Sequence, residues 1–136
     1  MDLNAWKRRK LTPTWGGNDK EAEPCRISYH PPSVGWMTRW REVAVQSPIF
    51  STEDIAERLK DSGFQDDLTK WTDGFQGFRE EFLRGLIVGV EGLTMDGKDV
   101  PLSEAIEFIL DNEGLREEVF AAIVADGSLG DASGKD

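Results

Sequence analysis

The chain has 136 residues, and its 26 acidic and 16 basic side chains give a formal net charge of −10. This length corresponds to one domain, and a hydrophobic fraction of 38% with 5 Trp and 7 Phe residues can fill one core, which excludes a wholly disordered acidic chain. With 1 Cys and 1 His, the composition also excludes a disulfide framework and a Cys/His zinc site closed within one chain.

The charge is unevenly distributed along the chain. Residues 1–50 carry 8 basic and 5 acidic side chains, a net of +3, whereas residues 51–136 carry 8 and 21, a net of −13, and the two sum to −10. Such an acidic surface repels phosphate backbones, so we expect no nucleic-acid binding. The longest apolar run, Leu86–Val90, is far shorter than a bilayer span of about 18–20 residues. No apolar segment follows the basic residues 7–10, so we expect no signal peptide, no membrane association and a cytosolic location.

Residues 1–32 are predicted to form an irregular N-terminal arm, because prolines and the Gly16-Gly17 pair interrupt regular structure. Within the arm, residues 25–30 alternate in polarity, which is typical of a half-buried strand. Leu11–Trp15 is the expected partner strand, and the turn-forming residues 16–19 lie between the two. The arm is therefore expected to contain a small β-hairpin.

After Pro32, apolar residues recur at spacings of three and four, which predicts helices. Ser33 is the expected N-cap of a first helix that Pro48 ends. Ser51 and Asp54 resemble a capping box, which predicts a second helix of about three turns that Gly63 terminates.

The most periodic segment of the chain is an aromatic stripe whose members are separated by 3, 4, 3 and 4 positions: Leu68, Trp71, Phe75, Phe78 and Phe82. This spacing aligns side chains along one face of a helix. Burying one large aromatic side chain contributes about 2–3 kcal/mol, so we expect the stripe to anchor the core. Gly74 and Gly77 each cost about 1 kcal/mol in a helix interior. They are expected either to permit a close helix approach or to mark a break near Phe75.

Turn signals then punctuate the second half of the chain. Gly85, Gly89 and Gly92 indicate the end of the long helix, and Asp96-Gly97 predicts a short hairpin. Pro101 and Ser103 begin a last helical region, which Gly114 divides and Gly127 is expected to end. Its apolar faces comprise Ala105, Ile106, Ile109 and Leu110, and then Leu115, Val119, Phe120, Ile123 and Val124.

These elements predict a predominantly α-helical α+β fold with four to five amphipathic helices. The expected organisation is an N-terminal arm over residues 1–32, a helical domain over residues 33–127 and a flexible C-terminal tail over residues 128–136.

The residue types that carry chemistry in enzymes do not form a recognisable site. Cys25 and His30 fall on opposite faces of the predicted strand, so a Cys/His nucleophile pair is not expected. The Asp96–Asp99 turn lacks the alternating ligands and the terminal Glu of an EF-hand, and no P-loop ending is present. We therefore predict a non-enzymatic protein without cofactor or metal.

Two segments of the second half carry a family resemblance. They are Val88-Gly89-Val90-Glu91-Gly92-Leu93 and Asp96-Gly97-Lys98-Asp99-Val100-Pro101-Leu102-Ser103, followed by an amphipathic helix. This order resembles the C-terminal half of the small tail assembly chaperones of long-tailed bacteriophages, although Val90 stands where the family frequently has Trp. The basic start of the chain and a strand that ends in Tyr29-His30-Pro31-Pro32 are also similar in style.

The resemblance implies a non-enzymatic chaperone that binds the long, aggregation-prone tape-measure protein in the host cytoplasm before the tail tube polymerises around it. It implies no cofactor. Negative charge and an exposed apolar groove suit such a role. The expected partner-binding residues are Trp6, Trp15, Trp71, Phe75, Phe78, Phe82, Phe120 and Ile123. The alternative for the aromatic stripe, Phe120 and Ile123 is the domain's own core, and the alternative for Trp6 and Trp15 is packing of the arm on its own domain.

Two other functions stay open at this stage. An acidic inhibitor that mimics nucleic acid would gather the carboxylates of residues 53–81 and 104–118 on one face, but basic residues such as Arg79 and Arg84 are interspersed among them. A virion structural component, such as a connector or tail-completion protein, would form a homo-oligomer in which the arm reaches a neighbouring copy. Both functions share the expectation of protein partners.

Overall fold

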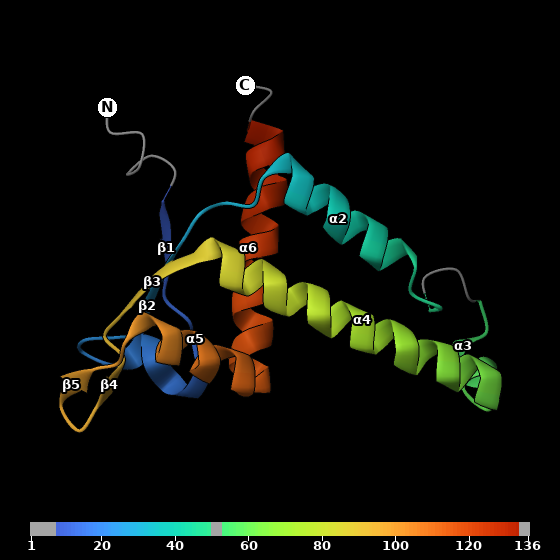
Figure 1. The fold of residues 1–136 in the computed structure, drawn as a ribbon, viewed down its shortest axis with the longest axis horizontal. Coiled ribbons are helices and arrows are strands. Elements are labelled where there is room, and N and C mark those ends of the chain that lie inside the picture. Colours follow the sequence, from blue (N-terminus) through green and yellow to red (C-terminus); the bar gives the residue numbers. More distant parts are fainter. Residues whose placement is uncertain (1–7, 50–52, 134–136) are drawn as a thin grey trace.

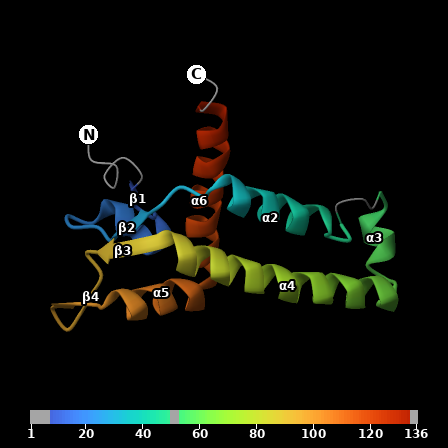
Figure 2. The same cartoon turned by 45° about the horizontal axis from the view of Figure 1, so that its top comes forward.

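The computed structural model describes residues 8–49 and 53–133 of the chain. A three-stranded sheet lies at one end of the molecule. Helices α2 (Val34–Val45) and α4 (Ser62–Leu86) extend side by side away from that end (Figure 1). The last helix crosses both of them, and the turned view in Figure 2 shows the same arrangement. The predicted α+β fold of predominantly helical content is confirmed.

The sheet joins segments that are far apart in the sequence. Its strands are β1 (Arg9–Leu11), β2 (Arg26–Tyr29) and β3 (Ile87–Glu91), in the order β1-β2-β3 with antiparallel pairing. Ile27 on the central strand lies opposite Leu11 on one side and Val90 on the other. The sequence predicts a pair formed by the first two strands but not β3, because the glycines around this segment indicate only the end of a helix. As the central strand, β2 buries Ser28 as well as Ile27 and Tyr29.

The expected partner strand Leu11–Trp15 is wrong in its bounds. Pairing with β2 ends at Leu11, and Trp15–Lys20 form a 3-10 helix, η1, in which Gly16 and Gly17 have φ of 64° and 78°. The Asn18 amide explains this compact turn. Its Nδ2 donates to the carbonyls of Pro13 (2.7 Å) and Cys25 (3.0 Å), and its Oδ1 accepts from the Cys25 amide (2.7 Å).

Helix α2 (Val34–Val45) begins as predicted, because the Ser33 hydroxyl accepts a hydrogen bond from the Trp36 amide. The expected second helix of about three turns is wrong: α3 (Ile55–Arg58) has four residues, and α4 (Ser62–Leu86) begins before Gly63. The Asp61 carboxylate caps α4 by accepting from the Gly63 amide, so this glycine lies in the first turn of a helix and does not end one. Ser51 lies outside the described residues, and Asp54 makes no side-chain capping hydrogen bond.

Both expectations for the glycines of the aromatic stripe are wrong. Helix α4 continues through Gly74 and Gly77 without a break, and a Cβ atom at either position would meet nothing within 4 Å. The close helix approach occurs instead at Gly85, where a Cβ would lie 3.2 Å from Cζ2 of Trp36.

The predicted hairpin after β3 is confirmed as β4 (Thr94–Met95) and β5 (Lys98–Asp99). Asp96 and Gly97 have φ of 53° and 78°, the two positive values that a type I′ turn requires. Helix α5 (Leu102–Asp111) and helix α6 (Glu113–Ser133) follow, divided next to Gly114 as expected. The expected helix end at Gly127 is wrong, since the backbone of α6 continues to Ser133. Gly127 allows close packing, because a Cβ there would lie 2.4 Å from Cγ of Pro32.

The core forms where α6 crosses α2 and α4. Phe82 is fully buried, and its ring centroid lies 5.5 Å from Trp36, 5.7 Å from Phe78 and 5.1 Å from Phe120. The stripe therefore anchors the core at its C-terminal end: Phe78 and Phe82 are buried there and Phe75 packs against them, whereas Leu68 and Trp71 are half-buried outside the core cluster.

Candidate functional site

The structure places the described sequence-predicted partner residues in buried, half-buried and exposed positions. Phe78, Phe82, Phe120 and Ile123 are buried in the core cluster, which is the alternative considered for them, so in this conformation they offer no surface to a partner. Trp71 is half-buried; its Nε1 donates to the Val43 carbonyl (2.8 Å), and its ring stacks on Phe75 (centroids 5.2 Å apart). Trp15 is exposed, and Trp6 lies outside the described residues.

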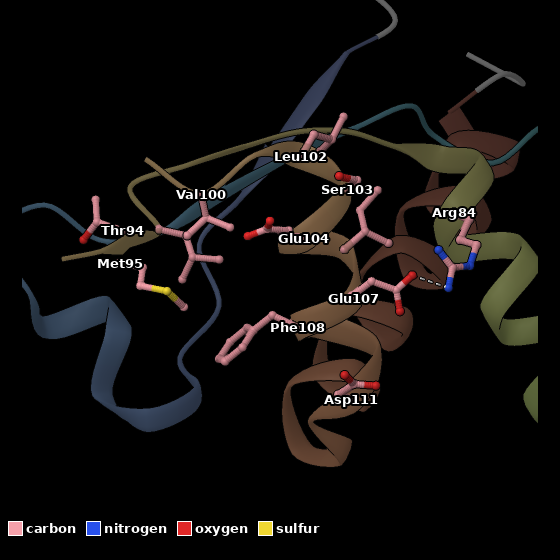
Figure 3. Close-up of a pocket in the computed structure, with 12 residues that line it drawn as sticks. Arg84, Thr94, Met95, Val100, Leu102, Ser103, Glu104, Glu107, Phe108 and Asp111 are labelled. Carbon is pink, nitrogen blue, oxygen red and sulfur yellow. Dashed lines mark ion pairs between the residues drawn. The ribbon is translucent and has the colours of Figure 1, made fainter. Parts of the chain in front are cut away.

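An apolar groove with a volume of about 790 Å³ lies between the β4–β5 hairpin and α5 (Figure 3). We call it the α5 groove. Met95 and Val100 approach it from the hairpin side, and Phe108 projects from α5. The groove is lined by Arg84, Leu93, Thr94, Met95, Val100, Leu102, Ser103, Glu104, Ile106, Glu107, Phe108 and Asp111.

Local structure explains why apolar side chains are left exposed here. The stripe Ala105, Ile106, Ile109 and Leu110 faces the core, whereas Phe108 lies off this stripe and is 39% exposed. The type I′ turn carries Met95 away from the body of the protein, so that it is 66% exposed. Leu102, in the first turn of α5, is 40% exposed. Three large exposed apolar side chains thus line the groove, Met95 from the hairpin and Leu102 and Phe108 from α5.

The apolar surface continues from the groove toward the arm. The Trp15 ring meets the Phe108 ring edge to face, with centroids 5.9 Å apart. On the other side of Phe108 lies a second depression of about 320 Å³, which Trp15 and Cys25 help to line. Since Leu93, Thr94 and Phe108 belong to both depressions, the two form one extended surface.

The rim of the α5 groove is acidic. Glu104, Glu107 and Asp111 line it against the single cation Arg84, which gives a formal charge of 1 − 3 = −2. Arg84 is held by Glu107 (2.6 Å) and Glu80 (3.0 Å), and these hydrogen bonds, the one to Glu107 foremost, raise the pKa of its guanidinium. The groove therefore combines an apolar floor with a negatively charged edge.

The Cys25 thiol at the second depression is held in its protonated form. Burial raises the pKa of the Cys25 thiol, and the neighbouring charges of Glu21 and Glu91 raise it further, which disfavours the thiolate. In residues 8–49 and 53–133, no three His, Cys, Asp or Glu side chains are placed to hold a metal ion. In the same ranges, no helix combines the length and the apolar character needed to cross a membrane.

Sequence reasoning missed Met95, Leu102 and Phe108 as candidate binding residues. One signal was available: Phe108 is a large aromatic residue outside the apolar stripe of its helix. The exposure of Met95 and Leu102 depends on how the hairpin and α5 are placed, which no local pattern encodes.

Comparisons of the chain with protein-family models, with curated proteins and with solved structures found no match.

Proposed function

We propose that this protein is a non-enzymatic assembly chaperone that holds an apolar helical segment of a tape-measure-like phage tail protein in its α5 groove. The observation that carries the proposal is the exposed apolar floor formed by Met95, Leu102 and Phe108 beside Trp15. Exposed apolar surface of this kind is typical of protein-binding sites. The host cytoplasm, where tail proteins are assembled, is the corresponding location.

The form of the groove favours a helical client segment. Its two walls are the β4–β5 hairpin and helix α5, and both contribute apolar side chains to the lining. An amphipathic helix binds such a site by placing its apolar face in the groove. The acidic rim favours a segment with Lys or Arg beside the apolar face, because complementary charges speed association and select the orientation.

The charge of the whole chain supports a holding role. A net charge of −10 keeps the chaperone soluble through self-repulsion while the groove is exposed. The alternative of a nucleic-acid mimic is disfavoured, because basic side chains interrupt the acidic surface in ion pairs such as Arg39–Glu81 (2.7 Å) and Lys10–Glu91 (3.0 Å).

Co-expression with a tape-measure-like tail protein tests the proposal. The wild-type chaperone should raise the soluble yield of this client, and the double variant Met95→Ser/Phe108→Ser should lose most of the effect. Val45→Ser is the matched control, because Val45 is an exposed apolar residue at the end of α2, away from the groove. An unchanged client yield with a well-folded wild-type chaperone would refute the proposal. A stable ring of copies in size measurements would instead support the virion-component alternative.

A further inference from the structure

A third, smaller pocket lies where α4, α5 and the start of α6 meet. It has a volume of about 270 Å³ and is formed mainly by charged side chains. Its lining contains Arg79, Arg84 and Arg116 together with Glu80, Glu107 and Asp111. Three arginines and three carboxylates therefore face one small cavity.

Arg79 is the unusual member of this lining. The residue is only 6% exposed, and its Nε is buried without a hydrogen-bond partner. Its guanidinium lies over the Phe75 ring, 4.9 Å from the centroid. The described residues hold it in no ion pair, although the charges of Glu113 and Glu117 act on it. Burying a charged group with an unsatisfied donor is costly, and a further acceptor would offset part of that cost.

Arg116, on α6, also has a guanidinium group whose hydrogen-bond donors are not all satisfied. Its Nη1 donates to the Leu110 carbonyl (3.1 Å), but its Nε is buried and unpartnered. The pKa of Arg79 is lowered, first by burial and then by the charge of Arg116, against the opposing charges of Glu117 and Glu113. Two guanidinium groups therefore repel each other at the wall of one pocket, and an anion between them would relieve the repulsion.

The carboxylates of the lining limit how much negative charge the pocket accepts. Glu80 and Glu107 are already bound to Arg84, so Asp111 remains as a negative group of the lining without an ion pair among the described residues. The six side chains sum to 3 − 3 = 0. A doubly charged phosphate would be repelled by these carboxylates more strongly than a singly charged group. A planar carboxylate also matches the edge of a guanidinium fork.

Gly77 leaves the pocket open on its α4 side. Gly77 lines the pocket from α4, and a Cβ atom there would meet nothing within 4 Å. A glycine in a helix interior makes the helix less stable than an alanine would. At Gly77 no close packing offsets this loss, since a Cβ would have no neighbour there. Its effect on the surface is to leave the pocket open beside Arg79.

We propose that the pocket between α4, α5 and α6 is a binding site for a single carboxylate group, with Arg79 and Arg116 as its ligands. The carboxylate comes from a small organic acid or from an acidic side chain of a protein. Arg84, Glu107 and Asp111 line both this pocket and the α5 groove, but Arg79 and Arg116 line only this pocket, so the proposal does not rest on the function of the groove.

NMR of the arginine Nε–H signals tests the site directly. Sodium acetate should shift the Arg79 and Arg116 signals saturably, whereas sodium chloride and sodium phosphate at the same ionic strength should not. Acetyl-Ala-Glu-Ala-amide, with the Gln peptide as its control, distinguishes the two sources. Tighter binding of the Glu peptide than of acetate assigns a protein side chain as the ligand, and tighter binding of acetate assigns a small acid.

Two variants complete the test. Arg79→Gln should weaken acetate binding about tenfold or more, as expected for loss of a charged hydrogen-bond donor. Gly77→Leu should block the opening while Arg79 is retained, and Gly74→Leu, also at an open helix position but outside the lining, should bind like the wild type. Shifts that do not saturate, that chloride or phosphate reproduces, or that are equal in the two leucine variants would overturn the proposal.

Discussion

The Glu118 carboxylate of α6 binds the backbone of Thr14, the N-cap residue of η1. It accepts hydrogen bonds from the amides of Thr14 (2.6 Å) and Trp15 (3.0 Å) and from the Thr14 hydroxyl (3.1 Å). One turn earlier on α6, a Cβ at Gly114 would lie 3.1 Å from the Trp15 ring. Residues 8–32 therefore pack on the domain that follows them, and this contact places Trp15 beside Phe108.

Glu118→Ala should destabilise the fold by about 1 kcal/mol, because it leaves two backbone amides without their acceptor at a site that solvent partly reaches. Urea unfolding followed by tryptophan fluorescence measures the change. Glu117→Ala is the control, since Glu117 lies beside Glu118 on α6 but is exposed and binds no amide of the arm. Equal losses in the two variants would contradict the contact.

Tyr29 should titrate far above an ordinary tyrosine. Its pKa is raised to about 12, first by burial and then by the hydrogen bond from its hydroxyl to Asp126 (2.9 Å) and the charge of that carboxylate, while Arg9 opposes the shift. The chain contains 1 Tyr, so the tyrosinate absorbance reports this residue alone. The midpoint should lie near 12 in the folded protein and near the ordinary value of 10 in urea.

The same shift predicts a loss of stability at high pH. Because the folded pKa is raised, the neutral hydroxyl stabilises the fold fully below about pH 10, and this contribution is lost as the pH rises from 10 through 12. The urea midpoint of Tyr29→Phe should fall less over this window than that of the wild type. A parallel fall in both proteins would show that Tyr29 does not contribute.

Two glycine-to-alanine substitutions should change stability in opposite directions. Gly74→Ala should stabilise the protein by about 1 kcal/mol, because the position is exposed within α4 and open to a Cβ. Gly127→Ala should destabilise it by about 1–3 kcal/mol, since a Cβ would lie 2.4 Å from the rigid Pro32 ring and 2.7 Å from Sδ of Met37. Thermal unfolding checks both, and a gain at Gly127 would contradict the packing described.

Phe82→Ala should destabilise the fold by about 3–5 kcal/mol, because the ring is fully buried among Trp36, Phe78 and Phe120. Phe108→Ala should cost only about 1–2 kcal/mol, since part of that ring is already in water. Urea unfolding of the two variants distinguishes a core residue from a groove residue. Similar losses would mean that Phe108 is a core residue and would remove it from the binding surface.

The amino-acid sequence by itself determined the local elements. The spacing from Leu68 to Phe82 specified a helix with a buried aromatic face, Ser33 specified the start of α2, and Asp96-Gly97 specified a type I′ turn. Each of these features depends on residues that are close to one another in the sequence, so their periodicity and turn chemistry are sufficient.

Tertiary structure alone decided what these elements contact. The segment Ile87–Glu91 becomes a strand because β2 offers it an unpaired edge, and Ile27 pairs with Val90 across a long stretch of sequence. Likewise, Met95, Leu102 and Phe108 form a groove because the hairpin and α5 pack beside each other without filling the space between them. Pairing and exposure of this kind depend on residues far apart in the chain, and the order of residues within one element does not carry that information.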